Sequence, residues 1–131
     1  MRASLRVAIV AGLAMLALAP TPAMASLFTA AQAYNAHRYG EALTEFERLA
    51  TGGDSKAQLY AGLMYDNGLG TARNETRAFY WYMRAAKQAQ PRAQFNVADM
   101  LYQGSGTRQD HHAAMTWFER SANNVKFSVK A

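Results

Sequence analysis

One segment of the sequence repeats itself at a fixed distance of 36 residues. Residues 57–86 align with residues 93–122 without a gap, and ten of the thirty aligned positions are identical. The same offset, run backwards, finds a third and more divergent copy, whose matching positions are Ala42, Phe46, Arg48 and Ala50. A period of this length is typical of arrays in which small, similar units stack on one another.

Each of the two clear copies contains two stretches of helical character. The second stretch carries apolar or small residues at i, i+3, i+4, i+7 and i+8, which places them on one face of a helix. These residues are Ala78, Trp81, Tyr82, Ala85 and Ala86 in one copy, and Ala114, Trp117, Phe118, Ser121 and Ala122 in the next. The first stretches, residues 57–65 and 93–102, are apolar on several sides, so we expect them to lie between neighbours, with both tryptophans in the core.

Local signals support this division into helices. Gly62 stands inside a predicted helix, where glycine costs about 1 kcal/mol relative to alanine, so we expect the backbone of an adjacent helix to approach closely there. Asn74 and Asp110 precede the second helix of each copy and suit the position that caps its free amides. The sequence therefore predicts an all-α fold built from helical hairpins.

The first 25 residues have the order of a secretory signal peptide. Two arginines precede thirteen apolar or small residues, two prolines follow, and Ala23-Met24-Ala25 suits cleavage after Ala25. The alternative is an uncleaved membrane anchor, but a spanning helix needs about 20 apolar residues. No cysteine follows the apolar run, which excludes a lipid-anchored amino terminus, and we expect a periplasmic or secreted protein.

Removal of this segment changes the composition of the chain. The whole sequence has 131 residues, a net charge of +5 and no cysteine. The remaining 106 residues carry 12 basic and 9 acidic side chains, so the net charge falls to +3. This weak basicity gives little support to nucleic-acid binding. Without disulfides, the exported domain must be stabilised by packing.

The repeated residues resemble those of the Sel1-like repeat family, which is related to the tetratricopeptide repeats. The resemblance rests on Ala61-Gly62, Met64-Tyr65, Gly68-Leu69-Gly70, Asn74 and the run Trp81-Tyr82-Met83-Arg84-Ala85-Ala86. It implies a short right-handed α-solenoid of about three antiparallel helix pairs with a concave face. The expected units are residues 27–54, 55–90 and 91–122, followed by a tail over residues 123–131.

Signs of catalytic, metal or nucleotide chemistry are weak in the mature sequence. His111 and His112 are adjacent, so they point about 100° apart on a helix, and no third ligand has a recognisable spacing. The two Gly-x-Gly segments lack the strand and lysine of a phosphate loop, and suit turns with positive φ. No serine has a hydrolase signature around it. We expect no cofactor, no metal and no enzymatic activity.

The concave face supplies the candidate binding site. By analogy with tetratricopeptide scaffolds, it is lined by the positions of the first helices that the repeat does not use for its core. These residues are Lys56, Leu59, Leu63, Asp66, Asn67, Arg92, Phe95, Asp99, Tyr102 and Gln103. They combine an apolar strip with charges of both signs, a surface suited to a helix or an extended peptide. The alternative is that Leu59, Leu63 and Phe95 only pack against adjacent helices.

The carboxyl-terminal end suggests a second surface. Nine residues follow Ala122, too few for another hairpin, although solenoid ends usually need a cap. Either Val125, Phe127 and Val129 fold back over the last helix pair, or the exposed end associates with a partner such as a second copy. The sequence as a whole predicts an exported module that binds another protein, and the alternative is an envelope enzyme or a cell-wall-binding accessory protein.

Overall fold

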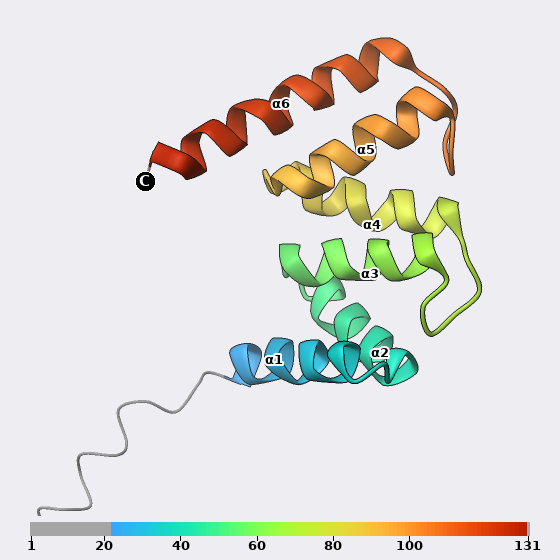
Figure 1. The fold of residues 1–131 in the computed structure, drawn as a ribbon, viewed down its shortest axis with the longest axis vertical. Helices are drawn as coiled ribbons and strands as arrows, with labels where there is room; N and C mark the ends of the chain where they lie inside the picture. The colour runs from blue at the N-terminus through green and yellow to red at the C-terminus, as the bar shows by residue number, and fades with distance from the viewer. Residues whose placement is uncertain (1–21, 131) are drawn as a thin grey trace, which may run out of the picture.

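The computed structural model describes residues 22–130 of the chain, with side chains for residues 26–126. Residues 1–21, which hold most of the predicted signal peptide, and residue 131 lie outside this range. The described part contains six α-helices and no strand (Figure 1). These helices are α1 (Pro22–Asn35), α2 (Tyr39–Thr51), α3 (Ser55–Asn67), α4 (Glu75–Lys87), α5 (Pro91–Gln103) and α6 (His111–Lys130).

The helices form three antiparallel pairs that stack along one axis. Each helix packs mainly against the helix before it and the helix after it in the chain (Figure 1). The pairs are α1 with α2, α3 with α4, and α5 with α6. The arrangement is a short right-handed α-solenoid, and it confirms the predicted fold class.

Glycines shape the loops within the second and third pairs. Gly68 and Gly104 end α3 and α5 with φ values of 64° and 72°, in the left-handed region that favours glycine. Two residues later, Gly70 and Gly106 also have positive φ and touch the first turn of the preceding pair's second helix. A Cβ atom at residue 70 would lie 2.5 Å from the carbonyl oxygen of Tyr39. The Gly-x-Gly segments are therefore turns that also lock one unit against the next.

Side chains cap four of the helices at their amino ends. The Asn74 side chain accepts a hydrogen bond from the amide of Arg77 at 3.0 Å, and Asp110 accepts one from the amide of Ala113 at 2.9 Å. Both caps were expected from the sequence. Asp54 and Gln90 cap α3 and α5 in the same manner.

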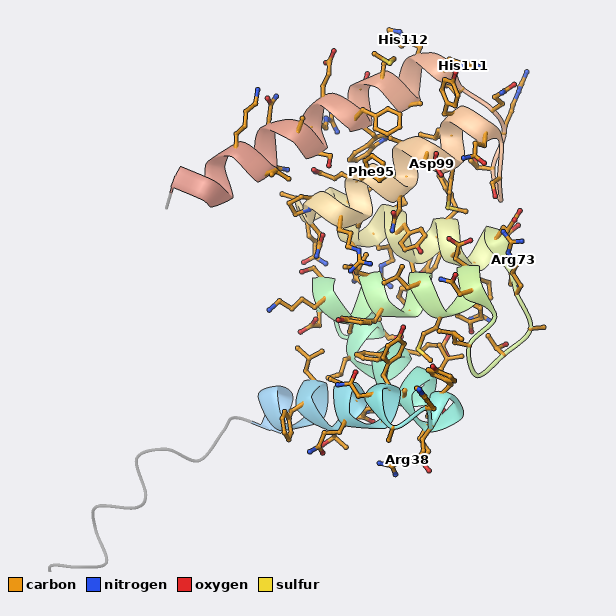
Figure 2. The ribbon with its side chains drawn as sticks, viewed as in Figure 1. Arg38, Arg73, Phe95, Asp99, His111 and His112 are labelled. Atoms are coloured by element: carbon orange, nitrogen blue, oxygen red, sulfur yellow. The ribbon has the colours of Figure 1, made fainter. Side chains whose placement is uncertain are left out.

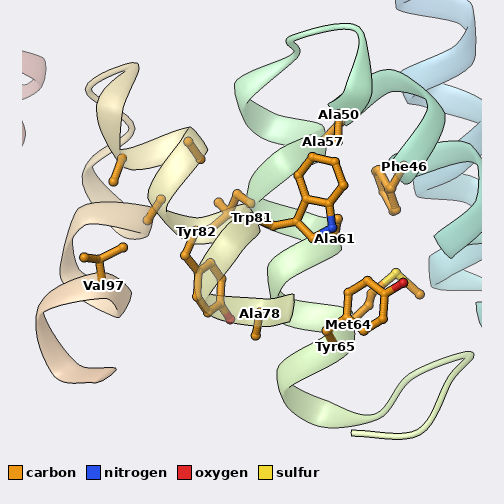
Figure 3. Close-up of a cluster of buried hydrophobic side chains, with 14 of the residues drawn as sticks. Phe46, Ala50, Ala57, Ala61, Met64, Tyr65, Ala78, Trp81, Tyr82 and Val97 are labelled. Atoms are coloured by element: carbon orange, nitrogen blue, oxygen red, sulfur yellow. The ribbon is translucent and has the colours of Figure 1, made fainter. Parts of the chain in front are cut away.

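The core follows the apolar stripes of the second helices (Figure 3). All five stripe residues of α4, including Trp81, are buried. The equivalent stripe of α6 is only partly covered, because Ala114 and Ser121 are buried, Trp117 and Phe118 are half-buried and Ala122 is exposed. The prediction for this helix was therefore only partly correct. Within residues 22–130, no following helix pair packs against the outer side of α6.

Hydrogen-bonded amide side chains recur at the joints between pairs. Gln58 donates a hydrogen bond to the carbonyl oxygen of Ala50, and Gln94 does the same to Ala86, each at 3.1 Å. Both glutamines are buried, so these bonds satisfy amides that would otherwise be costly to desolvate. The side-chain oxygen of each glutamine accepts a further bond at 2.8 Å, from Gln88 and Asn124 respectively.

Helix α6 continues past the point at which α2 and α4 end. Thr51 and Lys87, the last residues of those helices, both align with Asn123 of α6, yet α6 runs on to Lys130. The turns after α2 and α4 place Gly53 and Ala89 at φ values of 102° and 62°. The residue at this position in the third unit is Val125. A β-branched side chain strongly disfavours positive φ, so the helix continues instead of turning.

Residues 123–130 of the predicted tail over residues 123–131 are therefore part of α6. Val125 does not fold back over the last pair, because it lies on α6 itself and is 49% exposed. The side chains of Phe127 and Val129 lie outside the described residues. None of the helices in the described range is long and apolar enough to cross a membrane.

Candidate partner-binding surface

The ten predicted site residues all lie on α3 or α5, but they do not form one surface. Leu59 is buried in the core at 4% exposure, so it is removed from the candidate site. The prediction that Leu59 lies on an open face is wrong, because neighbouring helices enclose this side chain. The other nine residues divide between the seam that joins α3 to α5 and the outer side of α5.

The hydroxyl group of Tyr82 marks the seam between α3 and α5. Tyr82 extends from α4, and its hydroxyl donates to a carboxylate oxygen of Asp66 on α3 at 3.4 Å. The side chain of Asn96 on α5 and the charge of Arg92 also act on this hydroxyl, and both favour its ionised form. Burial, reinforced by the Asp66 carboxylate, raises the pKa of Tyr82 far above its ordinary value of 10.0.

Two of the predicted residues therefore act on Tyr82, which the sequence predicts to be a core residue: Asp66 through a hydrogen bond and Arg92 through its charge. Asn96 completes the contact and was not predicted. Gly62 was the one sequence signal of this contact. A glycine that faces a large aromatic residue leaves space for that residue to pass between two helices.

Arg73 holds the carboxyl end of α3 in place (Figure 2). Its Nε atom donates to the carbonyl oxygen of Asp66 at 2.9 Å, and its guanidinium forms an ion pair with Glu75 at 2.7 Å. At the same end of each first helix, Asn67 donates to the carbonyl oxygen of Leu63, and Gln103 donates to Asp99, both at 2.8 Å. The polar groups at this end are thus largely engaged with one another.

Two cations at the opposite end of the same helices remain unpaired. Lys56 on α3 and Arg92 on α5 occupy equivalent positions one repeat apart, close to the amino ends of their helices. Both side chains are exposed, and neither forms an ion pair with any residue that the structure describes. The half-buried Leu63 lies further along α3, and Asp99 is its repeat equivalent on α5.

An aromatic cluster borders the first seam, between α1 and α3. The ring of Tyr60 stacks on Phe46 with a centroid distance of 4.8 Å and meets Tyr34 edge-on at 5.7 Å. Tyr34 and Tyr60 are both half-buried. The sequence analysis did not identify this cluster, because the first helices are apolar on several faces and the pattern does not say which face is covered.

Phe95 and Tyr102 belong to the outer side of the last pair. Phe95 is 53% exposed and meets Phe118 of α6 edge-on, with a centroid distance of 5.3 Å (Figure 2). Tyr102 is 51% exposed, and its ring meets the ring of His111 edge-on with a centroid distance of 4.7 Å. The described residues contain no group of three His, Cys, Asp or Glu side chains placed to hold a metal.

The stacked helix pairs define a helical repeat protein of the α-solenoid class. The Sel1 repeat model matches residues 55–89 and 91–124, which is more than half of the chain. The protein belongs to the Sel1 repeat family.

Solved structures of similar proteins share this fold. A Sel1 repeat protein from Oxalobacter formigenes is 31% identical, with a TM-score of 0.70 over 74% of this chain and 40% of its own. A protective antigen with an SLR fold from uropathogenic Escherichia coli is 24% identical, with a TM-score of 0.74 over 77% of this chain and 22% of its own. Cysteine rich protein B of Helicobacter pylori is 15% identical, with a TM-score of 0.62 over 64% of this chain and 63% of its own.

One similar curated protein is chitin synthase regulatory factor 3 of Schizosaccharomyces pombe. It is 42% identical to this chain over 52 residues. The match covers 40% of this chain but only 6% of the yeast protein. The likeness is thus confined to a short stretch of repeats within a much longer protein.

Proposed function

We propose that this protein is an exported interaction module that binds a segment of another protein on the seam between α3 and α5. The observation that carries the proposal is the pair of exposed cations, Lys56 and Arg92, which lack ion-pair partners among the described residues and lie on neighbouring first helices. Sel1 repeats generally serve as protein-interaction modules, which supports a binding role without catalysis or a cofactor.

The chemistry of the seam indicates the kind of segment that it would bind. Lys56 and Arg92 would attract carboxylates, while Leu63 offers an apolar contact and Asp99 an acceptor further along the helices. A helix or an extended peptide with acidic residues at one end and an apolar residue at its centre would match this order. Exposed charges of this kind contribute mainly to the rate and specificity of association.

The proposed location is the periplasm of a Gram-negative bacterium or the medium beyond it. It rests on the order of residues 1–25, with cleavage after Ala25. Such cleavage would make Ser26, within the first turns of α1, the first residue of the mature chain. Amino-terminal sequencing of the protein from a periplasmic fraction should begin at Ser26. An intact Met1 in the membrane fraction would show that residues 1–25 act as an anchor.

The binding surface can be tested by reversing its charges. A photo-crosslinking residue placed at Leu63 should trap a specific partner in the producing cell, whereas the same residue at Lys87 on α4 should not. The partner, identified by mass spectrometry and purified, is then titrated against the double variant Lys56→Glu and Arg92→Glu. We expect its affinity to fall by about tenfold or more, and the loss should diminish at high salt.

A matched control carries the same change in net charge elsewhere. Lys87→Glu combined with Arg108→Glu alters two exposed cations outside the seam. This control should bind the purified partner as the wild type does. Equal losses in both double variants would mean that net charge, and not the seam, governs binding, and the proposed site would then be wrong.

A further inference from the structure

The outer side of the last helix pair is uncovered at positions that are buried in the preceding pair. Leu59 on α3 is 4% exposed, whereas Phe95, its equivalent 36 residues later on α5, is 53% exposed. On the second helices, Ala86 is 1% exposed but its equivalent Ala122 is exposed. The α3/α4 pair has α5 packed against it, and no helix within residues 22–130 takes that place on α5/α6.

We call this surface the end face and define it by Phe95, Met115, Phe118, Ala122 and Val125. It includes an open groove of about 440 Å³ between the start of α5 and the second half of α6. Phe95 and Val125 line this groove, together with Gln90, Pro91, Arg92 and Ser121. The end face is therefore both apolar and hollowed, as expected of a surface that a helix could fill.

The α6 part of the end face has the spacing of a coiled-coil seam. Met115, Phe118, Ala122 and Val125 are separated by three, four and three residues, which is the a and d pattern of a heptad. Met115 is 57% exposed and Val125 49% exposed, so the stripe is open along the helix. Because α6 extends beyond the usual end of a second helix, the stripe is longer than the repeat itself requires.

The charged residues beside the stripe are placed so that a two-fold rotation brings opposite charges of two copies together. Glu119 and Lys126 both occupy the e position of this heptad, seven residues apart, and both are exposed. Neither forms an ion pair with another residue in the described range. In an antiparallel pair of helices the e positions face each other. Glu119 of one copy would then oppose Lys126 of the other, and symmetry would produce this ion pair twice.

We propose that the protein forms a symmetric dimer in which the end faces of two copies pack together with their α6 helices antiparallel. This interface meets the seam proposed to bind a partner at Arg92, which lines the groove. The residues that test the dimer, Glu119, Val125 and Lys126, lie on α6 outside that seam, so each proposal can fail without the other. A symmetric arrangement needs only one self-complementary surface, which the stripe and its flanking charges supply.

The opposite end of the solenoid differs from the end face in its charges. Its ion pairs, Arg38–Glu41 and Arg48–Glu45, involve α2 and the residue before it, whereas α1 has no charged side chain. Phe28 is the large apolar residue exposed on α1. A head-to-tail contact would not place Glu119 of one copy against Lys126 of the other, whereas the symmetric pairing does so twice.

The area is sufficient for a moderately stable dimer. A 20-residue helix is about 30 Å long, and two packed helices are about 20 Å wide, so each copy offers roughly 600 Å². The total of about 1,200 Å² lies at the lower limit of stable interfaces. We therefore expect association in the micromolar range.

The first test is the mass of the processed protein as it is recovered from the producing cell. Sedimentation equilibrium between about 1 and 200 µM should show a monomer that becomes a dimer and does not grow further. Val125→Asp should weaken the dimer by at least a hundredfold, with an unchanged circular dichroism spectrum because the residue is exposed. Phe28→Asp, the matched control at the other end, should leave the dimer intact.

The second test distinguishes this pairing from any other dimer. Glu119→Lys and Lys126→Glu should each weaken association by about tenfold, because each creates like-charge contacts at both symmetric positions. The variant that carries both changes should dimerise as the wild type does. Because the chain has no cysteine, Glu119→Cys mixed with Lys126→Cys should yield a mixed dimer with a short bismaleimide in preference to either homodimer.

Three outcomes would overturn the proposal. They are a monomer at every concentration, a dimer that Phe28→Asp disrupts and Val125→Asp does not, and a charge-swapped double variant that fails to recover. Masses that continue to rise beyond the dimer would instead indicate head-to-tail association and would equally exclude the symmetric interface.

Discussion

The ring of Tyr82 lies directly against the backbone of Gly62. A Cβ atom at residue 62 would be 2.5 Å from Cδ1 and 2.6 Å from Cε1 of that ring, closer than packed atoms allow. Tyr82 extends from α4 through this gap and reaches Asp66 with its hydroxyl. The predicted approach of a neighbouring helix backbone at Gly62 is therefore wrong, because the side chain of Tyr82 makes the close contact.

Gly62→Ala should therefore destabilise the protein. The added methyl group must displace the buried Tyr82 ring, and overpacking of this kind costs about 1–3 kcal/mol. Gly40→Ala in α2 is the matched control, since a Cβ atom there meets no other atom within 4 Å. Alanine is the better helix former, so this control should gain up to about 1 kcal/mol. Urea unfolding followed by circular dichroism measures both, and equal effects would contradict the packing argument.

The raised pKa of Tyr82 predicts a loss of stability in alkali. Its ordinary pKa is 10.0, and burial raises the pKa in the folded protein, so the unfolded chain loses the proton first. The free energy of unfolding should be constant with respect to this group below about pH 9. It should fall above pH 10 by up to about 1.4 kcal/mol per pH unit.

Tyr82→Phe should reduce that alkaline slope. Tyr80→Phe removes a tyrosine that is 53% exposed on the same helix and is the matched control. Urea titrations at several pH values between 8 and 11 give the slopes. A Tyr82→Phe variant with the slope of the wild type would mean that the hydroxyl ionises as readily in the folded protein as in the unfolded one.

The two tryptophans should differ in their contribution to stability. Trp81 is 4% exposed and is enclosed by α2, α3 and α4, so Trp81→Ala should cost about 3–5 kcal/mol. Trp117 is half-buried and covered on one side by Arg120 at 4.7 Å, so we expect Trp117→Ala to cost about half as much. Chemical denaturation of the two variants gives the comparison. Equal losses would show that the end of the array is as well packed as its centre.

A polar contact between α2 and α3 should be energetically coupled. The buried Tyr65 donates its hydroxyl to Glu47 at 2.6 Å, and Arg77 from α4 lies over the Tyr65 ring at 4.8 Å. A double-mutant cycle with Tyr65→Phe and Glu47→Ala should give a coupling of about 1 kcal/mol.

The exposed pair Arg38 and Glu41 provides the control for that cycle. Its atoms are 2.8 Å apart, but both side chains are more than half exposed, so the coupling should be below about 0.5 kcal/mol. If the two cycles gave the same value, burial of the Tyr65 hydroxyl would have no influence on the strength of the contact.

The fold could be predicted because its signals are local and repeated. The spacing of Ala78, Trp81 and Tyr82 gives the direction of the buried face, and Asn74 marks the start of the same helix. The 36-residue offset then predicts that the next unit has the same helices in the same order. These features depend on residues close together in sequence, so no knowledge of distant contacts was needed.

The candidate site could be predicted only in part, because the same position can have different neighbours in successive units. Leu59 and Phe95 are equivalent in the repeat, yet one is enclosed and the other is open. The pattern of a single helix cannot say which unit is the last one covered. Tyr82 is fully buried, as its place in the apolar stripe predicts, but the stripe does not show that its hydroxyl reaches Asp66.

The course of α6 was the clearest failure, although its signal is present in the sequence. Val125 occupies the position where Gly53 and Ala89 adopt positive φ. A turn there would require positive φ at a β-branched residue, which valine disfavours.

The valine at position 125 occupies the place where the chain would have to turn before a further unit could be added. A unit of this kind is added when a helix ends, the chain reverses, and a new helix lies across the pair just formed. Val125 disfavours the positive φ that such a reversal uses, and α6 runs straight on to Lys130. A designer who wished to lengthen this array would begin by placing glycine at residue 125, before adding any new helix.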